Sequence, residues 1–243
     1  RDIAVFPIVR RICERIMKTE QCYKSPTDMG VNRVGFAITD DAVVREASSQ
    51  EIIRRWFRYN CEYTLGGADR DTLDRVKVLM DNLGLKETDR PVVEPARSAA
   101  VRASQTKGKG NDGFYCGAAL QLPDGCMHAA SSCLLNAVKK SAKLPDELQL
   151  IAPGVIESVR LLKKNIFRSR RVSLDLDETL IALSVSANSN PTAKLALSQL
   201  RKLAGCEMHI SHLPTPGDEA GLRKLGINLT CDPKFASRDL FVD

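Results

Sequence analysis

The amino-acid sequence predicts an α/β protein, α+β overall, in which a mainly helical part (residues 1–106) precedes a three-layer α/β/α subdomain (residues 107–243). Two observations lead to this prediction. Apolar residues recur at helical spacing through the first part, and from residue 113 onward candidate strands alternate with candidate helices. Such alternation is typical of helices packed on a largely parallel sheet. A glycine-rich stretch, 107–113, lies where the pattern changes.

Four helices are expected in the first part. The first covers residues 1–17, and the third covers 73–83 and ends at Gly84, a residue type that favours helix C-termini. The fourth, 94–106, is rich in alanine. The second carries an apolar stripe opposite several arginines; its members are Ile52, Ile53, Trp56, Phe57 and Cys61.

In the second part, strands are expected at 114–122, 148–151, 206–212 and 227–230. The first of them ends at the turn Pro123-Asp124-Gly125, and a helix is expected to begin near Met127. Further helices are expected after the second strand and at 176–187, 191–204 and 217–225. Asn190 and Thr215 are the expected N-caps of the last two, each followed by proline at the first helical position.

Composition narrows the class of protein. The 243 residues include 36 Lys and Arg against 30 Asp and Glu, a net charge of +6, and no apolar run reaches 18 residues. We therefore expect no membrane span and no nucleic-acid partner. The eight cysteines form no CxxC pair, which is typical of reduced cysteines in a cytoplasmic protein. Because Arg1 opens a helix-like stretch, we expect the chain to be part of a longer one.

The densest basic run is 163–171, at the expected end of a helix. We interpret it mainly as a solvated helix end, where cations face the negative pole of the helix dipole. The alternative is a contact for phosphate or for a partner.

The string Asp175-Leu176-Asp177-Glu178-Thr179 matches the DxDxT pattern of haloacid-dehalogenase-type phosphatases. In those enzymes the two aspartates emerge from a buried central strand, whereas residues 167–173 here are too polar for one. Residues 180–185 continue at a helical period. We therefore interpret the acidic residues as the first turn of a helix that follows a serine cap.

The segment 117–137 resembles the core of the cytidine-deaminase-like fold, with the strings Gly117-Ala118-Ala119, His128-Ala129-Ala130 and Asn136-Ala137. In active members a zinc ligand precedes a catalytic glutamate by two residues, and a Pro-Cys-x-x-Cys supplies the other ligands. His128 matches the first ligand, but Ala130 replaces the glutamate, and Gly154 and Glu157 replace the cysteines. The resemblance therefore implies a scaffold of deaminase type without metal or cofactor.

Nearly the whole chain resembles the second half of the bacterial domain-of-unknown-function family numbered 1846. This resemblance implies a longer protein with an N-terminal α/β half, and it carries over no activity. The matching strings are Tyr23-Lys24-Ser25-Pro26-Thr27-Asp28-Met29-Gly30-Val31-Asn32, Gly108-Lys109-Gly110-Asn111-Asp112-Gly113, Asn190-Pro191-Thr192-Ala193 and the run from Pro214 to Asn228.

Two loops are candidate binding segments. The first combines Lys24, Thr27, Asp28 and Asn32 with backbone breakers, and it is either a site or a loop held by Asx-type hydrogen bonds. The second is the glycine-rich stretch 107–113, which offers free N–H groups and two ammonium groups, as phosphate cradles do. Its alternative is a linker between the parts. Its candidate ligand-binding residues are Lys107, Lys109 and Asn111.

The remaining candidates lie at strand ends and helix starts. His212 would lie at the C-terminal end of a strand, where α/β sheets place ligands. His209 is three residues earlier and so would face the other side of the strand. Thr215, Asn190 and Thr192 are first of all helix starts, and a helix N-terminus also attracts anions.

Two hypotheses follow from the sequence. In the first, an anionic, nucleotide-like or phosphorylated small molecule binds between the two parts, with Asp28, His128 or His212 moving protons and the missing N-terminal half supplying further groups. The lysines at 24, 107 and 109 would meet phosphate, and Asn32 and Asn111 would orient the substrate. In the second, a metal-less scaffold serves oligomerisation, with the Trp56–Phe57 stripe as the interface of a homo-oligomer.

Overall fold

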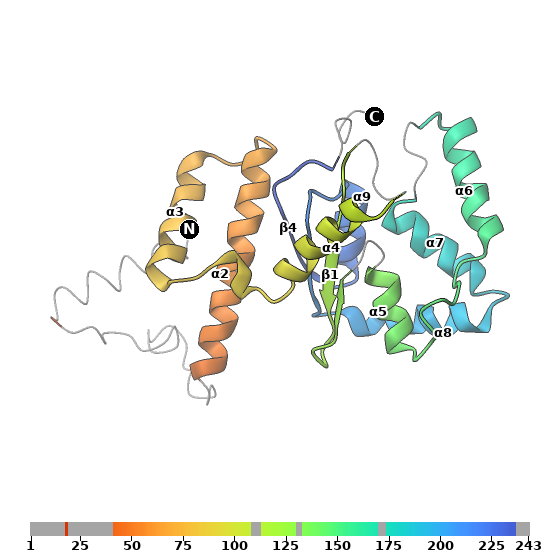
Figure 1. Cartoon of the computed structure of the whole chain (residues 1–243), viewed down its shortest axis with the longest axis horizontal. Helices are drawn as coiled ribbons and strands as arrows, with labels where there is room; N and C mark the ends of the chain where they lie inside the picture. The colour runs from red at the N-terminus through yellow and green to blue at the C-terminus, as the bar shows by residue number, and fades with distance from the viewer. Residues whose placement is uncertain (1–17, 19–40, 108–112, 130–132, 170–173, 237–243) are drawn as a thin grey trace. The chain divides into compact units, whose positions relative to one another are not determined.

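A computed structural model describes residue 18 and residues 41–107, 113–129, 133–169 and 174–236 (Figure 1). The chain divides into two compact units, Arg1–Arg90 and Pro91–Asp243. The sequence predicts a boundary between residues 106 and 107, whereas this division puts helix α4 (Val93–Gln105) in the second unit. The reason is that α4 packs on the sheet, mostly against its strand β1 (Ala118–Gln121). The expected helix 1–17 and the loop 24–32 lie outside the described residues.

The first unit contains two long helices, α2 (Asp41–Thr64) and α3 (Arg70–Leu83), and the short 3-10 helix η3 (Glu87–Asp89). Gly84 ends α3 in the left-handed conformation at φ 66°, as its sequence position predicts. The indole N–H of Trp56 donates a hydrogen bond to Glu87 at 2.8 Å. Phe57, a member of the stripe predicted as an interface between copies, is 1% exposed within this chain.

The second unit is built on a four-stranded sheet in the order β2-β1-β3-β4. Beside β1, its strands are β2 (Met127–Ala129), β3 (Glu207–Ile210) and β4 (Asn228–Cys231). The expectation of a largely parallel sheet is wrong, because among the described strands only β3 and β4 pair in parallel. A tight turn joins β1 to β2 and forces an antiparallel pair, while helix α9 (Pro216–Lys224) joins β3 to β4 and allows a parallel one.

Two expected elements of the second unit differ from the structure. The expected helix start near Met127 is wrong, because the turn at Gly125 (φ 81°) brings Met127–Ala129 back along β1 as β2, and the helix that follows is described from Cys133. The expected strand 148–151 is irregular. Leu150 and Ile151 still contribute to the core, so their apolar character reflects burial rather than strand pairing.

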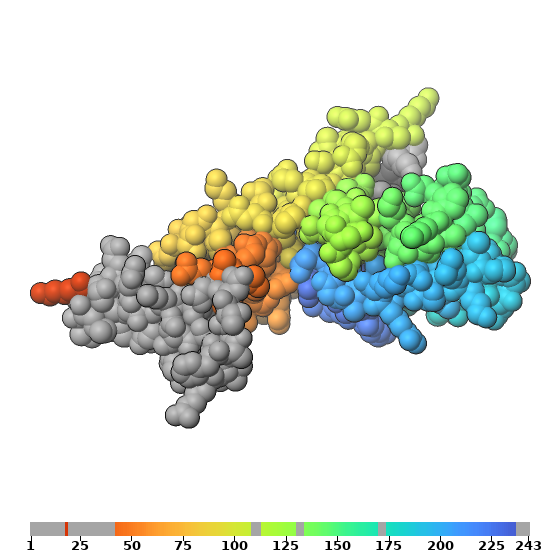
Figure 2. Space-filling model, turned by 90° about the horizontal axis from the view of Figure 1, so that it is seen from below, coloured from red at the N-terminus to blue at the C-terminus, as the bar shows by residue number. Residues whose placement is uncertain are grey.

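The sheet has helices on both faces, which confirms the expected α/β/α layers. On one face, which Ala119, His209 and Thr230 share as neighbours across β1, β3 and β4, helix α4 packs on β1, β2 and β3. The main core lies on the other face, where Leu120, Met208 and Leu229 meet residues of the remaining helices. Those helices are α5 (Cys133–Ser141), α7 (Leu176–Ser186), α8 (Pro191–Gln199) with the 3-10 turn η4 (Leu200–Leu203), and α9. In Figure 2 the green and blue segments of this unit lie against one another.

Helix starts in the second unit follow local chemistry. Asp175 caps α7 by accepting a hydrogen bond from the backbone N–H of Glu178 at 2.9 Å, and Glu178 accepts one in return from Asp175 N–H. The acidic string is therefore a helix start, as expected, with Asp175 as the cap in place of a serine. Asn190 and Thr215 cap α8 and α9 as expected. Helix α6 (Pro153–Asn165) begins with proline and packs on α7. No helix among the described residues has the length and apolarity needed to cross a bilayer.

Candidate functional site

The parallel pair β3 and β4 brings polar residues to one edge of the sheet. Ser211 and His212 follow β3, while Asp232 and Lys234 follow β4. Beyond the strands the two segments stay side by side, since the N–H of Leu213 donates to the carbonyl of Lys234 at 2.7 Å. Because the C-terminal ends of parallel strands are where α/β sheets place ligands, this edge is the candidate functional site.

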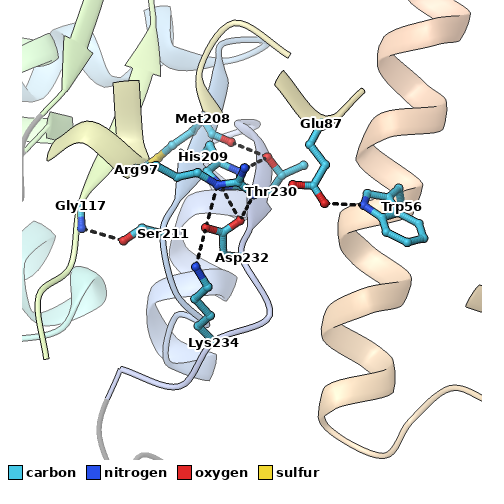
Figure 3. A network of polar contacts seen from close by, with 10 residues as sticks. All are labelled: Trp56, Glu87, Arg97, Gly117, Met208, His209, Ser211, Thr230, Asp232 and Lys234. Carbon is cyan, nitrogen blue, oxygen red and sulfur yellow. Dashed lines mark hydrogen bonds and ion pairs between the residues drawn. The ribbon is translucent and has the colours of Figure 1, made fainter. Parts of the chain in front are cut away.

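A buried carboxylate is the centre of this edge (Figure 3). Asp232 is 1% exposed and accepts two hydrogen bonds from Arg97 of α4, at 2.6 and 3.0 Å. Nε2 of His209 lies 3.3 Å from the same carboxylate, and Nζ of Lys234 lies 3.9 Å from it. We call Arg97, His209, Thr230, Asp232 and Lys234 the Asp232 cluster. Its single carboxylate thus faces three groups that carry or can carry positive charge.

The interior of the Asp232 cluster resembles a hydroxyl–imidazole–carboxylate series, but it offers no nucleophile to a substrate. Nδ1 of His209 lies 2.9 Å from the Thr230 hydroxyl, which donates its single proton to the carbonyl of Met208 at 3.2 Å. His209 and Thr230 are 0% and 4% exposed. A catalytic hydroxyl must reach its substrate, so these two residues position Asp232 and attach β4 to β3.

The charges around Asp232 lower the pKa of its carboxyl group far below the usual range. Burial alone would raise this pKa, but the adjacent His209 and the two hydrogen bonds and positive charge of Arg97 outweigh burial. Asp232 is therefore ionised at all physiological pH values, and the pair with Arg97 is permanent.

This pKa predicts how stability depends on pH. A carboxyl group with a lowered folded-state pKa contributes stability that is present above its unfolded pKa of about 3.9 and is lost as the pH falls below it. We expect the unfolding free energy of the chain to fall between about pH 5 and pH 3. The Asp232→Asn variant should show a shallower fall over this range in urea titrations. An equally steep fall would show that other carboxylates cause it.

Helix α4 approaches the sheet closely at this edge. The N–H of Gly117, next to β1, donates to the Ser211 hydroxyl at 2.9 Å, and its carbonyl accepts from Ser211 N–H at 2.8 Å. A Cβ atom on Gly117 would lie 2.3 Å from the carbonyl oxygen of Ala96 in α4. Only glycine lets α4 come near enough for Arg97 to reach Asp232.

The structure places the predicted site residues in different parts of the fold. Of the predicted loop residues only Lys107 is described, and it is exposed after the end of α4. The others lie outside the described residues; they are Lys24, Thr27, Asp28, Asn32, Lys109 and Asn111. His212 and Thr215 lie together after β3. Thr215 donates to Asp218 at 2.6 Å and accepts from its N–H at 3.1 Å, which is a helix cap.

His128, Asn190 and Thr192 lie apart from that edge cluster. The expectation that His128 opens a helix is wrong, because it lies in β2 opposite Leu120 and so on the face away from His209. Its Nε2 atom is buried and has no hydrogen-bond partner in the described chain. Asn190 accepts hydrogen bonds from the N–H and the hydroxyl of Thr192, at 3.0 and 2.6 Å. Both residues thus serve the start of α8.

The sequence alone does not predict a role for Arg97, Thr230, Asp232 or Lys234. Arg97 and Asp232 are 135 positions apart, and no local pattern links them. One signal was present: Asp232 follows a strand predicted to end at Thr230, at the end of the sheet where ligands bind. Within the described residues, no group of three or more His, Cys, Asp or Glu could hold a metal ion.

The fold and the site define a class of protein: a two-unit α/β chain whose second unit has a charged sheet edge. The chain belongs to the DUF1846 family, since the model described as "Domain of unknown function DUF1846, C-terminal" matches residues 88–241. The corresponding N-terminal model matches residues 1–84. The family resemblance inferred from the sequence is therefore confirmed, whereas the deaminase-like fold stays a prediction.

Curated bacterial relatives carry the name UPF0371 protein. The chain is 44% identical to one from Clostridium botulinum strain Eklund 17B over 251 aligned residues, which cover 99% of this chain and 49% of that protein. It is 45% identical to another from strain Langeland over 250 residues, with the same coverage. The chain thus spans about half the length of the curated relatives it matches.

Proposed function

We propose that the second unit binds a small anionic, phosphate-bearing molecule at the sheet edge that carries the Asp232 cluster. One observation supports this most directly: the only carboxylate of the cluster is 1% exposed, while Arg97 and Lys234 are 31% and 72% exposed. Around Asp232, solvent therefore meets the two cations, and the carboxylate lies beneath them. His212 and Thr215 follow β3 at the same edge.

Phosphate suits this arrangement for two reasons. A guanidinium group has five N–H donors in a planar fork, of which Asp232 takes two from Arg97, and a lysine binds phosphate as a point charge. The buried carboxylate also fixes the guanidinium, so less side-chain entropy is lost when a ligand arrives. Nucleotides and sugar phosphates share this group, and the proposal extends to that class.

The test compares two lysines on opposite edges of the sheet. Lys234 is at the C-terminal edge of β3 and β4, whereas Lys202 in η4 precedes β3 and is exposed at the other edge. We expect pyrophosphate or AMP to raise the Tm of the 243-residue chain at constant ionic strength. Lys234→Gln should weaken their binding about tenfold, equivalent to about 1.4 kcal/mol. Lys202→Gln should bind as the wild type does.

Two results would contradict the proposal. One is a Tm that stays unchanged when inorganic phosphate, pyrophosphate or AMP is added at a concentration about 100 times a micromolar Kd. The other is an equal loss of binding in the Lys202→Gln variant, which would indicate attraction by net charge alone.

Burial favours a second candidate, in which the unit is a non-catalytic module on a metal-less scaffold of deaminase type. His209, Thr230 and Asp232 are almost inaccessible, as structural ion networks are. In that case Lys234→Gln changes neither ligand binding nor stability, because this lysine is mostly exposed. The same variant thus separates the two functions.

A further inference from the structure

The first unit contains an open cavity with a volume of about 350 Å³, within the range of cavities that hold small molecules. Its walls come from three elements. Trp56 lies on α2, Met80 and Gly84 lie in the last turns of α3, and Leu85 and Lys86 lie in the segment that follows. Met80 is 3% exposed, so the floor of the cavity is apolar.

Hydrogen bonds fix these walls without any ligand. The indole N–H of Trp56 donates to Glu87 at 2.8 Å and so holds the ring in one orientation (Figure 3). At the end of α3 the N–H of Leu85 donates to the carbonyl of Met80 at 2.9 Å, and the left-handed Gly84 allows this reversal of the chain. Because the walls are already ordered, a ligand loses less binding energy to side-chain entropy.

The apolar surface of the cavity favours a planar aromatic ring. Trp56 is only half-buried, so part of its ring stays accessible, and aromatic rings prefer to stack with an offset or to meet edge to face. The thioether of Met80 is a favourable neighbour for the edge of such a ring. Leu85 adds a further half-buried apolar side chain.

The charges around the cavity favour an anionic group on that ring. Lys77 and Asp81 are one turn apart on α3 and form an ion pair with each other. The carboxylate of Glu87 accepts the indole N–H. Lys86, by contrast, is exposed and has no carboxylate partner among the described residues. Its ammonium group is therefore the cation that a ligand can neutralise.

We infer that this cavity binds an aromatic carboxylate, with its ring against Trp56 and its carboxylate at Lys86. One ammonium group matches one negative charge, which suits a carboxylate better than a phosphate dianion. The end of α3 does not oppose an anion strongly, since the carbonyls of Met80 and Asp81 already accept backbone N–H groups. The cavity belongs to the first unit alone, so its ligand is independent of the phosphate proposed for the second.

The experiment follows the fluorescence of the 243-residue chain, in which Trp56 is the only tryptophan. A change in emission therefore reports on the wall of this cavity. We expect 3-phenylpropionate to change the emission with a Kd of about 1 mM or below. The amine of the same shape, 3-phenylpropylamine, should bind at least about tenfold more weakly, because it would bring a second cation to Lys86.

Variants at two cations separate this site from attraction by net charge. Lys86→Gln should weaken the binding of 3-phenylpropionate about tenfold, and Lys86→Glu should reverse the preference in favour of the amine. Arg70→Gln is the matched control, since its side chain is 79% exposed at the start of α3, and it should bind as the wild type does. Circular dichroism would verify that each variant is folded.

Three results would overturn the inference. The first is that neither the emission nor the NMR signal of the indole N–H of Trp56 changes up to about 10 mM 3-phenylpropionate. The second is that the amine binds the wild type as tightly as the carboxylate does. The third is an equal loss of binding in Lys86→Gln and Arg70→Gln, which would indicate net charge alone.

Discussion

The Asp232→Ala variant is expected to lose about 3–5 kcal/mol of unfolding free energy, the usual cost of removing one member of a buried ion pair. The loss should be this large because Arg97 gives Asp232 two hydrogen bonds, and His209 beside it is fully buried. Without the carboxylate, the guanidinium of Arg97 and the imidazole of His209, which can also become cationic, would face each other without a compensating negative charge. Urea titration monitored by circular dichroism would measure the change.

A surface pair provides the control for this variant. Asp177 lies 3.7 Å from Lys224, with side chains 45% and 74% exposed, so Asp177→Ala should cost less than about 1 kcal/mol. The Arg97→Met, Asp232→Leu double variant should be more stable than Asp232→Ala alone, since it leaves no guanidinium unpaired. Equal losses for Asp232→Ala and Asp177→Ala would show that the Asp232 cluster is not a structural centre.

Gly117→Ala is expected to destabilise the second unit by about 3 kcal/mol or more, at the upper end of what overpacking costs. The added Cβ would lie 2.3 Å from the carbonyl oxygen of Ala96 and 2.4 Å from the N atom of Ala100. Both are backbone atoms, so no side-chain rotation relieves the clash and α4 has to move away from the sheet. This movement would also lengthen the contact between Arg97 and Asp232.

Gly154→Ala is the matched control because a Cβ at Gly154 would meet nothing within 4 Å. Gly154 lies in the first turn of α6, where alanine favours the helix. We expect this variant to be neutral or slightly more stable, as judged by its Tm. A Gly117→Ala variant as stable as Gly154→Ala would mean that α4 and the sheet are not closely packed.

The helices could be predicted because their signals are local. Asn190, Thr215 and Gly84 each cap a helix through hydrogen bonds to residues two to four positions away. The strand β2 could not be predicted, because its three residues, Met-His-Ala, have no strand preference of their own. They pair only because the preceding turn brings them to the open edge of β1.

The candidate site required tertiary information. His212 and Thr215 could be proposed from their place after a strand, which depends on topology alone. The Asp232 cluster joins α4 to the loop after β4. Its members come together only in the folded chain, where Gly117 lets α4 approach the sheet closely. The roles proposed for the residues in segments 24–32 and 108–112 stay predictions, because those residues lie outside the described ranges.

Both outermost strands of the sheet are short: β2 has three residues and β4 has four. A strand of this length presents few unpaired backbone groups to a strand of another molecule, which limits amyloid-like pairing and domain swapping. The proline at 233 further reduces the donors beyond β4. Sheet extension between copies is therefore disfavoured, and the concentrated protein should resist fibril formation.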